Sequence, residues 1–265
     1  MTKLEAELYA LTHRGNPGDR SYYAKACAGA QSVLELGTGY GRLIPDLLST
    51  DSRIRPRAVI GLDRDPALLA AAKHAVARLS PGSRRQVRLV RGDMRDFDLG
   101  QEFDRVILPY NGLYCLLNRK DIVRCFSCVK RHLAPGGEFI FDVWAADRFH
   151  RDTRSNARSQ AHYDDGEPIV SFAHRSQVWD VFEKSRLRCR VQRLDVTYTY
   201  VSRESGTSVT IPIEQRYAPS SELMELVTSA GLCIKAIYGN FARQRFGINS
   251  QYVVIRAGLG PQRGI

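Results

Sequence analysis

A short run that favours β structure, Ser32–Leu36, is followed at once by three closely spaced glycines and then by a helical pattern over Arg42–Leu48. Gly37, Gly39 and Gly41 allow the backbone to turn sharply and to approach a ligand. The amide groups at the start of the helix point into the same cleft. This segment therefore predicts a strand, a tight turn and a helix, with a binding site at the turn.

The same alternation of short apolar strands with helical patterns continues as far as Trp144. Further strands are expected at Ala58–Leu62, Val87–Val90, Phe103–Leu108 and Glu138–Val143, and helices at Ala67–Leu79 and Arg119–Leu133. Strands that alternate with helices are joined by right-handed crossovers, and such units build a parallel sheet.

After Trp144 the pattern changes to strand-like alternation without helices in between, which is typical of an antiparallel β insertion. Its strands are expected at Ile169–Ala173, Ser176–Phe182, Leu187–Tyr200 and Val209–Tyr217. A helix over Ser220–Ala230, capped by Ser220 or Ser221, and two strands at Cys233–Tyr238 and Ser250–Ala257 are expected to close the first sheet.

These patterns predict an α/β fold: a doubly wound, mostly parallel seven-stranded sheet with an antiparallel β insertion after the fifth strand. Residues 1–31 are expected to form an N-terminal lid or helical segment, residues 32–147 and 218–257 the core, and residues 148–217 a β-rich substrate-binding insertion. A length of 265 residues suits one α/β domain with a modest insertion.

Composition narrows the function classes. Hydrophobic residues at 43% and charged residues at 25% argue against long disorder. No segment reaches the roughly 18 apolar residues of a membrane span, and we expect a cytoplasmic protein without membrane contact. Cys125 and Cys128 have C-x-x-C spacing but no second pair accompanies them, so we expect packing and no metal site.

The formal charge of +11 would attract nucleic acid. The arginines are spread along the chain, however, with no basic tail and no known RNA-binding module. A nucleic-acid partner is therefore kept open but not favoured.

Acidic residues stand at two further strand ends. Asp63 ends the second strand, where a carboxylate can accept hydrogen bonds from both hydroxyls of a ribose. Asp65 precedes Pro66 and can cap the next helix, which leaves Asp63 for the ligand. Asp93 follows the third strand, although on its own it could be a plain turn residue.

The glycine segment Glu35-Leu-Gly37-Thr-Gly39-Tyr-Gly41 has the spacing G-x-G-x-G, whereas a dinucleotide fingerprint requires G-x-G-x-x-G. With Asp63 and the turn Gly92-Asp93-Met94, it resembles the class I S-adenosylmethionine-dependent methyltransferases. The resemblance covers Ser32 to Trp144 and the closing segments, and its layout is similar to bacterial small-molecule N-methyltransferases.

The resemblance implies S-adenosylmethionine as cofactor and S-adenosylhomocysteine as product. Asp63 would bind the ribose, and the turn after the third strand would bind the adenine. The implied cofactor-binding residues are Glu35, Gly37, Thr38, Gly39, Asp63, Arg64, Gly92, Asp93, Met94, Pro109 and Asn111.

Candidate catalytic residues follow the fourth strand, at the edge where an open α/β sheet leaves its ligand crevice. Asn111 and Tyr110 stand there, and Tyr9 is expected to join them from the N-terminal segment. The aromatic residues could equally be core residues. Expected acceptor-binding residues are Tyr114, Trp179, Arg216 and Tyr217.

The segment from Tyr9 to Asp19, with Arg14 and Asn16, is expected to be a loop that closes over the cofactor and orders when it binds. A plain surface loop is the alternative. A hydroxyl acceptor would need a general base, whereas a neutral amine would not. The histidines available for that role are His13, His150, His162 and His174.

The predicted function is transfer of a methyl group from S-adenosylmethionine to a nitrogen or oxygen of a small metabolite or short peptide, by a monomer or homodimer. Two alternatives stay open. One is an RNA or protein methyltransferase, and the other is a regulator that binds S-adenosylmethionine without catalysis.

Overall fold

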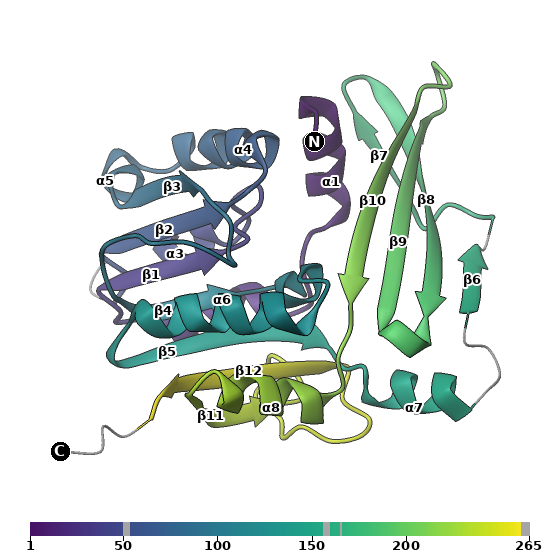
Figure 1. The fold of residues 1–265 in the computed structure, drawn as a ribbon. Helices are drawn as coiled ribbons and strands as arrows, with labels where there is room; N and C mark the ends of the chain where they lie inside the picture. Colours follow the sequence, from purple (N-terminus) through teal and green to yellow (C-terminus); the bar gives the residue numbers. More distant parts are fainter. Residues whose placement is uncertain (50–53, 156–159, 165, 261–265) are drawn as a thin grey trace.

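The computed structural model describes residues 1–49, 54–155, 160–164 and 166–260, which form two sheets (Figure 1). The larger sheet has the strand order β11-β12-β5-β4-β1-β2-β3. Its strands are β1 (Ser32–Leu36), β2 (Ala58–Asp63), β3 (Val87–Arg91), β4 (Phe103–Leu108), β5 (Leu133–Trp144), β11 (Leu232–Tyr238) and β12 (Tyr252–Leu259). Because β12 is antiparallel to both β5 and β11 while the other pairs are parallel, the predicted mostly parallel seven-stranded sheet is confirmed.

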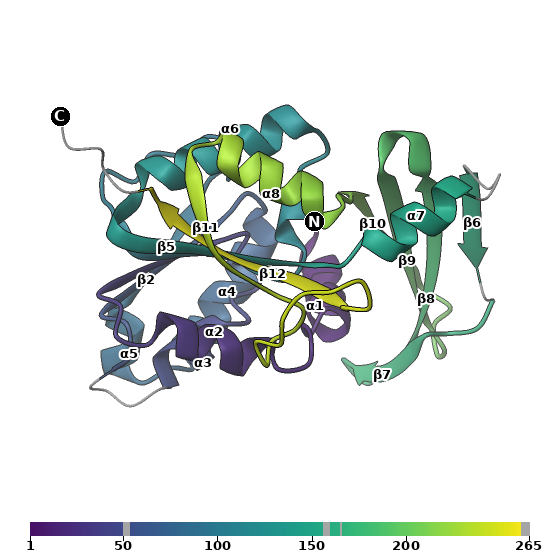
Figure 2. The same cartoon turned by 90° about the horizontal axis from the view of Figure 1, so that it is seen from below.

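Helices cover both faces of this sheet (Figure 2). Helices α6 and α8 lie on one face, and α2 and α3 lie on the other. The helices are α1 (Lys3–Thr12), α2 (Asp19–Cys27), α3 (Ile44–Ser49), α4 (Pro66–Ala77), α5 (Pro81–Arg85), α6 (Arg119–Arg131), α7 (Asp147–Ser155) and α8 (Ser220–Ser229), with short turns η1 (Gly112–Cys115) and η2 (Cys189–Val191). No helix in the described ranges is both long and apolar enough to cross a bilayer.

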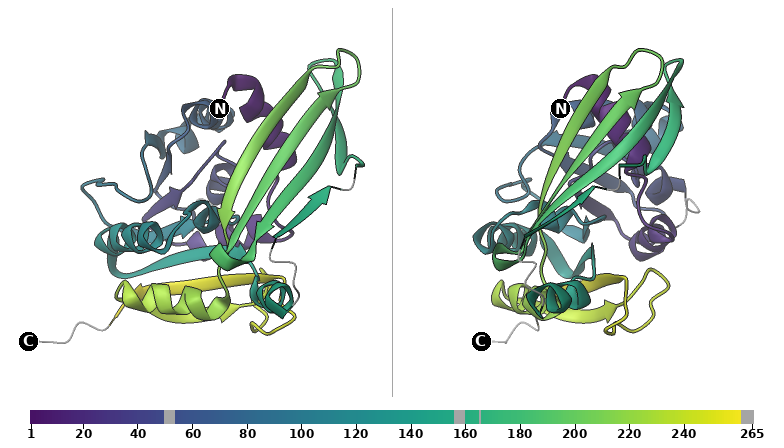
Figure 3. Two further views of the ribbon diagram at one scale, coloured as in Figure 1. Left: turned by 45° about the vertical axis from the view of Figure 1, so that its right-hand side comes forward. Right: turned by 90° about the vertical axis from the view of Figure 1, so that its right-hand side faces the viewer.

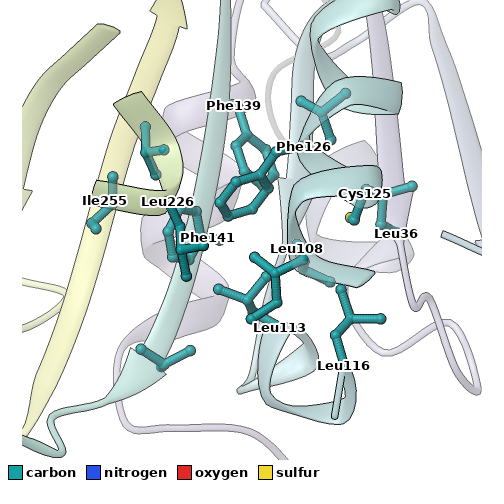
Figure 4. Close-up of a cluster of buried hydrophobic side chains, with 14 of the residues drawn as sticks. Leu36, Leu108, Leu113, Leu116, Cys125, Phe126, Phe139, Phe141, Leu226 and Ile255 are labelled. Carbon is teal, nitrogen blue, oxygen red and sulfur yellow. The ribbon is translucent and has the colours of Figure 1, made fainter. Parts of the chain in front are cut away.

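The main core lies between the sheet and the α6–α8 layer (Figure 4). Phe126 of α6 packs on Phe139 and Phe141 of β5, with ring centroids 5.4 Å and 5.7 Å away. Cys125 and Cys128 are buried in the same core, in line with the packing role expected for them.

The N-terminus of α4 is capped by a neighbouring residue in the chain, whereas that of α8 is capped by a residue far away in the sequence. Asp65 caps α4 by accepting from two backbone amides, as expected. The cap expected for α8 was wrong, because Ser220 is already inside the helix. Its amide and hydroxyl instead donate to Asp147 of α7, whose carboxylate takes the place of a local cap.

The smaller sheet is antiparallel and follows β5 through α7 (Figure 3). Its strands are β6 (Gln160–Asp164), β7 (Val170–His174), β8 (Gln177–Arg188), β9 (Arg193–Ser202) and β10 (Ser208–Arg216). The break expected at residues 183–186 lies instead at η2 and Gln192, whose φ of 53° makes the turn. Sequence reading missed this turn because Gln rarely adopts a left-handed conformation.

Helix α1 lies between the two sheets, against α4 on one side and β10 on the other (Figure 1). Leu8 of α1 joins the apolar cluster of the smaller sheet, which contains Trp179, Val181 and Tyr200. The expected loop therefore begins only after Thr12, since Tyr9 is helical. A capping box between Thr2 and Glu5, visible in the sequence as T-x-x-E, starts this helix.

Candidate active site

The glycine turn after β1 is open above two of its three glycines. Gly37 and Gly39 have φ values of 63° and 57°, and a side chain added at either would meet no atom closer than 3.9 Å. Gly41 is different, because an added Cβ would lie 3.2 Å from Ala72 of α4. Gly37 and Gly39 thus leave room for a ligand, whereas Gly41 permits α4 to pack closely.

Asp63 stands at the end of β2, directly across from this turn. Its Oδ2 accepts from the Gly39 amide at 2.8 Å and its Oδ1 accepts from the Asp65 amide at 2.9 Å. Each oxygen keeps lone-pair capacity for a further donor such as a ribose hydroxyl. Burial raises the pKa of Asp63, against the two backbone hydrogen bonds that lower it. This arrangement fits the ribose role expected for Asp63.

Glu35 and Thr38 shape the turn from beneath. Thr38 donates its hydroxyl to Glu35 Oε2 at 2.8 Å, and both side chains are buried. Burial raises the pKa of Glu35 to about 7, although the bond from Thr38 lowers it. Thr38 also faces Gly61, where a Cβ would lie 2.8 Å from its hydroxyl. These contacts show Thr38 packed against β2.

The turn after β3 lies beside the glycine turn. Gly92 donates its amide to the Asp63 carbonyl at 2.9 Å, and the Met94 methyl lies 4.0 Å from the Cβ position of Gly37. The carboxylate of Asp93 is engaged by Arg95, at 2.6 Å from the guanidinium and 2.9 Å from the amide. The structure thus gives Asp93 a strong partner within its own turn. Arg64, which directly follows Asp63 in the chain, is exposed.

The turn after β4 has an unusual backbone. Tyr110 and Asn111 have φ values of 53° and 60°, and two consecutive non-glycine residues in this region mark stored strain, which concentrates at functional sites. Asp142 of β5 holds the turn, since its Oδ1 accepts from the Tyr110 amide at 3.0 Å. Asn111 Oδ1 accepts from the Trp144 amide at 2.6 Å. Pro109 is buried at the strand end.

Asp142 also ties the N-terminal segment to the sheet. Tyr23 of α2 donates its hydroxyl to Asp142 at 2.6 Å, and the Asn16 amide approaches the other oxygen at 3.4 Å. Burial raises the pKa of Asp142 to about 6, despite hydrogen bonds that lower it. Sequence reading did not single out Asp142, because only the fold brings α2 and the loop to β5.

A buried ion pair anchors the same loop. Arg42 donates to both carboxylate oxygens of Asp19, at 3.0 Å and 2.7 Å, and its guanidinium lies 5.4 Å from the centre of the Tyr110 ring. Asp19, at the end of the expected lid, is 1% exposed and therefore packs into the protein. The Arg14 side chain donates to the Leu11 carbonyl at 2.8 Å, and the Arg14 carbonyl accepts from Arg42 at 3.4 Å.

Aromatic residues from three elements meet above the turn. His13 stacks on Tyr9 at 4.0 Å and meets Tyr198 of β9 edge-on at 4.8 Å and Tyr110 at 6.4 Å. Tyr9 and Cys115 both lie near enough to Asp63 to interact with it electrostatically. The structure thus brings Tyr9 and Tyr110 together beside the cofactor turn.

The four expected acceptor-binding residues are buried. Tyr114 is fully buried and its hydroxyl lies 3.0 Å from the carbonyls of Trp144 and Ala218, where the chain leaves and re-enters the core. Tyr217 is buried in the same seam against Trp144. This seam could not be predicted from the sequence, because it forms only when segments far apart in the chain pack together.

Arg216 and Trp179 are also held by packing. Arg216 is 6% exposed and forms an ion pair with Glu222 at 2.7 Å. Trp179 is 3% exposed in the cluster against α1. Both side chains thus have a structural role, and their expected contact with the acceptor stays a prediction.

Of the four candidate histidines, only His13 is shown in ring contact with Tyr9, Tyr110 and Tyr198 among the described residues. His174 pairs with Glu7 at 2.9 Å, and His150 packs on Tyr217. The side chain of His162 lies outside the described part of the chain.

Comparison with known proteins agrees with this geometry. Residues 33–137 match the model of a family described as a methyltransferase domain. Residues 33–137 are thus similar to a methyltransferase domain, and the sheet that contains them has the fold of the class I S-adenosylmethionine-dependent methyltransferases.

Among curated proteins, the chain is 30% identical over 172 residues to a dTDP-4-amino-2,3,4,6-tetradeoxy-D-glucose N,N-dimethyltransferase of Saccharopolyspora spinosa, covering 64% of this chain. It is 26% identical over 147 residues to a dTDP-3-amino-3,6-dideoxy-alpha-D-glucopyranose N,N-dimethyltransferase of Streptomyces fradiae, covering 52% of this chain. The matches span 58% and 52% of those two proteins, little more than half of their length.

Solved structures match over nearly the whole chain. The CcbJ methyltransferase from Streptomyces caelestis has a TM-score of 0.75 at 26% identity, with 93% of this chain and 91% of that chain covered. DesVI from Streptomyces venezuelae has a TM-score of 0.67 at 18% identity, with 97% and 98% covered, and supports the fold.

Proposed function

We propose that this chain is an S-adenosylmethionine-dependent N-methyltransferase whose acceptor is the amino group of a small metabolite, with an amino sugar as the leading class. The observation that carries the proposal is the position of Asp63, whose two oxygens are fixed by backbone amides across from the open glycine turn. The names of the curated relatives support an amino-sugar acceptor.

When bound, S-adenosylmethionine supplies an electrophilic methyl group on a positively charged sulfur. Asp63 would accept from the ribose hydroxyls, and the backbone of Gly37 and Gly39 would line the amino-acid end. Gly92, Asp93, Met94 and Arg64 would border the adenine, and Pro109 and Asn111 would form the floor toward the acceptor. Glu35 and Thr38 would support the glycine turn from beneath.

The chain's contribution to the chemistry is alignment and exclusion of water. The nitrogen–carbon bond forms as the carbon–sulfur bond breaks, sulfur keeps the electron pair, and the nitrogen afterwards releases a proton to solvent. A neutral amine has the required lone pair, so alignment of the reacting atoms supplies most of the rate. Tyr9 and Tyr110 would line the space around the reacting atoms and keep water out.

An RNA acceptor is favoured only by the net charge of +11. Many of the arginines in the smaller sheet and its neighbours are engaged in ion pairs, which reduces the positive surface available for phosphates. The pairs include Arg188 and Arg193 with Asp195, Arg203 with Asp180, and Arg119 with Glu222.

The test is transfer of a labelled methyl group from S-adenosylmethionine, in parallel, to three substrates: total RNA, a small-molecule extract, and a panel of primary amino sugars, free and as dTDP conjugates. We expect label in the amino-sugar arm and little in RNA. Calorimetric titration with S-adenosylmethionine and with NAD accompanies the assay. Labelling confined to RNA would overturn the acceptor class, and tighter binding of NAD would overturn the cofactor.

Deleting the smaller sheet would not test its proposed role over the acceptor. Leu8 of α1 shares a core with Trp179 and Val181 of that sheet, so the deletion would expose apolar surface on α1. Point variants that leave this core intact are the suitable probes.

A further inference from the structure

His13 occupies the place where three parts of the molecule meet. It follows the last residue of α1, stacks on Tyr9, and has Tyr198 of the smaller sheet and Tyr110 of the β4 turn at its ring edges. Its side chain is 8% exposed. The imidazole therefore lies between the cofactor turn and the smaller sheet, and not at the surface.

Its two ring nitrogens are used differently. Nδ1 lies 3.1 Å from the Tyr9 carbonyl, which can only accept, so we assign the ring proton to Nδ1. Nε2 is then a lone-pair acceptor, and it is buried with no hydrogen-bond partner among the described residues. A buried polar atom without a partner is costly, and at a binding site it marks a place for a ligand group.

The surroundings keep the ring neutral. Tyr9 faces it from α1, Tyr110 from the β4 turn and Tyr198 from β9, and Tyr198 pairs directly opposite Glu183 of β8. Burial lowers the pKa of His13 to about 4, although its backbone bond raises it. At neutral pH the ring thus offers an acceptor and no charge.

We propose that His13 Nε2 accepts a hydrogen bond from an N–H of the acceptor amine and thereby points the nitrogen lone pair at the methyl group. This inference rests on the proposed function and specifies its acceptor. A neutral primary amine has the required N–H, and so does the secondary amine formed by one transfer. The tertiary amine formed by a second transfer has none, so methylation should stop after two methyl groups.

Two substitutions separate the nitrogens of His13. His13→Asn keeps an amide near the position of Nδ1, where it can still donate to the Tyr9 carbonyl, but has no atom at the position of Nε2. His13→Gln reaches the position of Nε2 with an oxygen or nitrogen. His174→Asn is the matched control, because His174 is paired with Glu7 away from the aromatic group.

The probe is the amino sugar of the panel that the unaltered protein methylates fastest, together with its N-methyl and N,N-dimethyl forms. We expect His13→Asn to raise KM for the amine at least about tenfold and to lower kcat, while the Kd for S-adenosylmethionine changes less than about twofold. His13→Gln should recover part of the loss, and His174→Asn should behave as the unaltered protein. The N,N-dimethyl form should accept no label.

Wild-type kinetics in His13→Asn, or a third methyl group added by the unaltered protein, would overturn the inference alone. If the unaltered protein methylates no amine in the panel, the proposed function fails and the inference fails with it. Thermal unfolding shows whether His13→Asn is folded. If it is not, the amine KM of His13→Gln decides. An amine KM above that of the unaltered protein, with unchanged affinity for S-adenosylmethionine, supports the inference, and an unchanged amine KM overturns it.

Discussion

The carboxylate of Asp63 holds the amide of Gly39 at 2.8 Å, so the end of β2 fixes the glycine turn that follows β1. Asp63 ends β2 and Gly39 lies in the turn after β1, and these two parallel strands are paired from Ser32 to Leu36. The glycine turn is thereby held in place by the protein itself, which would reduce the ordering required if the cofactor binds there.

Asp63→Ala should weaken S-adenosylmethionine binding by about 1–3 kcal/mol, because the ribose hydroxyls would be left buried without an acceptor. Calorimetric titration measures the change. Asp65→Ala is the control: it removes the α4 cap and should cost about 1 kcal/mol of unfolding free energy with little effect on Kd. Unchanged affinity in Asp63→Ala would remove Asp63 from the site.

Glu35→Gln should stabilise the protein at alkaline pH. The pKa of Glu35 is about 7 in the folded protein against an ordinary value of 4.5. Below about pH 4.5 Glu35 is protonated in both the folded and the unfolded protein. As the pH rises toward 7, the unfolded chain loses this proton first, so the free energy of unfolding falls by on the order of 3 kcal/mol in full.

The gain from Glu35→Gln should therefore be absent at pH 4.5 and complete at pH 8, as measured by urea unfolding at both values. Glu102→Gln, at an exposed position, is the control and should show no such difference. An equal gain at both pH values would show that burial of the ionised carboxylate is not the cause.

Arg42→Met should destabilise the protein by about 3–5 kcal/mol, because it leaves the buried carboxylate of Asp19 without its partner. Amide exchange over residues 13–19 should accelerate as the loop loses its anchor. Arg20→Met breaks the exposed pair with Asp46 and should cost less than about 1 kcal/mol. If the loop instead exchanges rapidly in the unaltered protein and slows only with cofactor, the lid expectation holds and the anchor is weak.

Tyr114→Phe should lower the unfolding free energy by about 1 kcal/mol, because its hydroxyl bonds the carbonyl oxygens of Trp144 and Ala218. Urea unfolding measures this loss. The amine KM should stay unchanged, since the ring is fully buried in the seam. A raised KM without loss of stability would return Tyr114 to the acceptor site.

Much of the fold could be predicted because its signals are local. The strand, glycine turn and helix around Gly37 follow from a few consecutive residues. So does the expectation that Asp65 caps α4 while Asp63 faces the glycine turn. Backbone conformation and helix capping depend on the nearest neighbours in the chain, and those are visible in the sequence.

The acceptor side depended on contacts between distant segments. Asn16 meets Asp142 across 126 residues, and Tyr114 reaches Ala218 across 104. Alternation along a strand shows that one face is covered but not by what, so the packing of α1 on Trp179 could not be predicted from the sequence. The sequence by itself determined the sheet, the cofactor turn and its carboxylate, because those depend on neighbouring residues. Only the tertiary structure decided that His13, Tyr110 and Tyr198 meet, because three separate elements must pack together before that group exists.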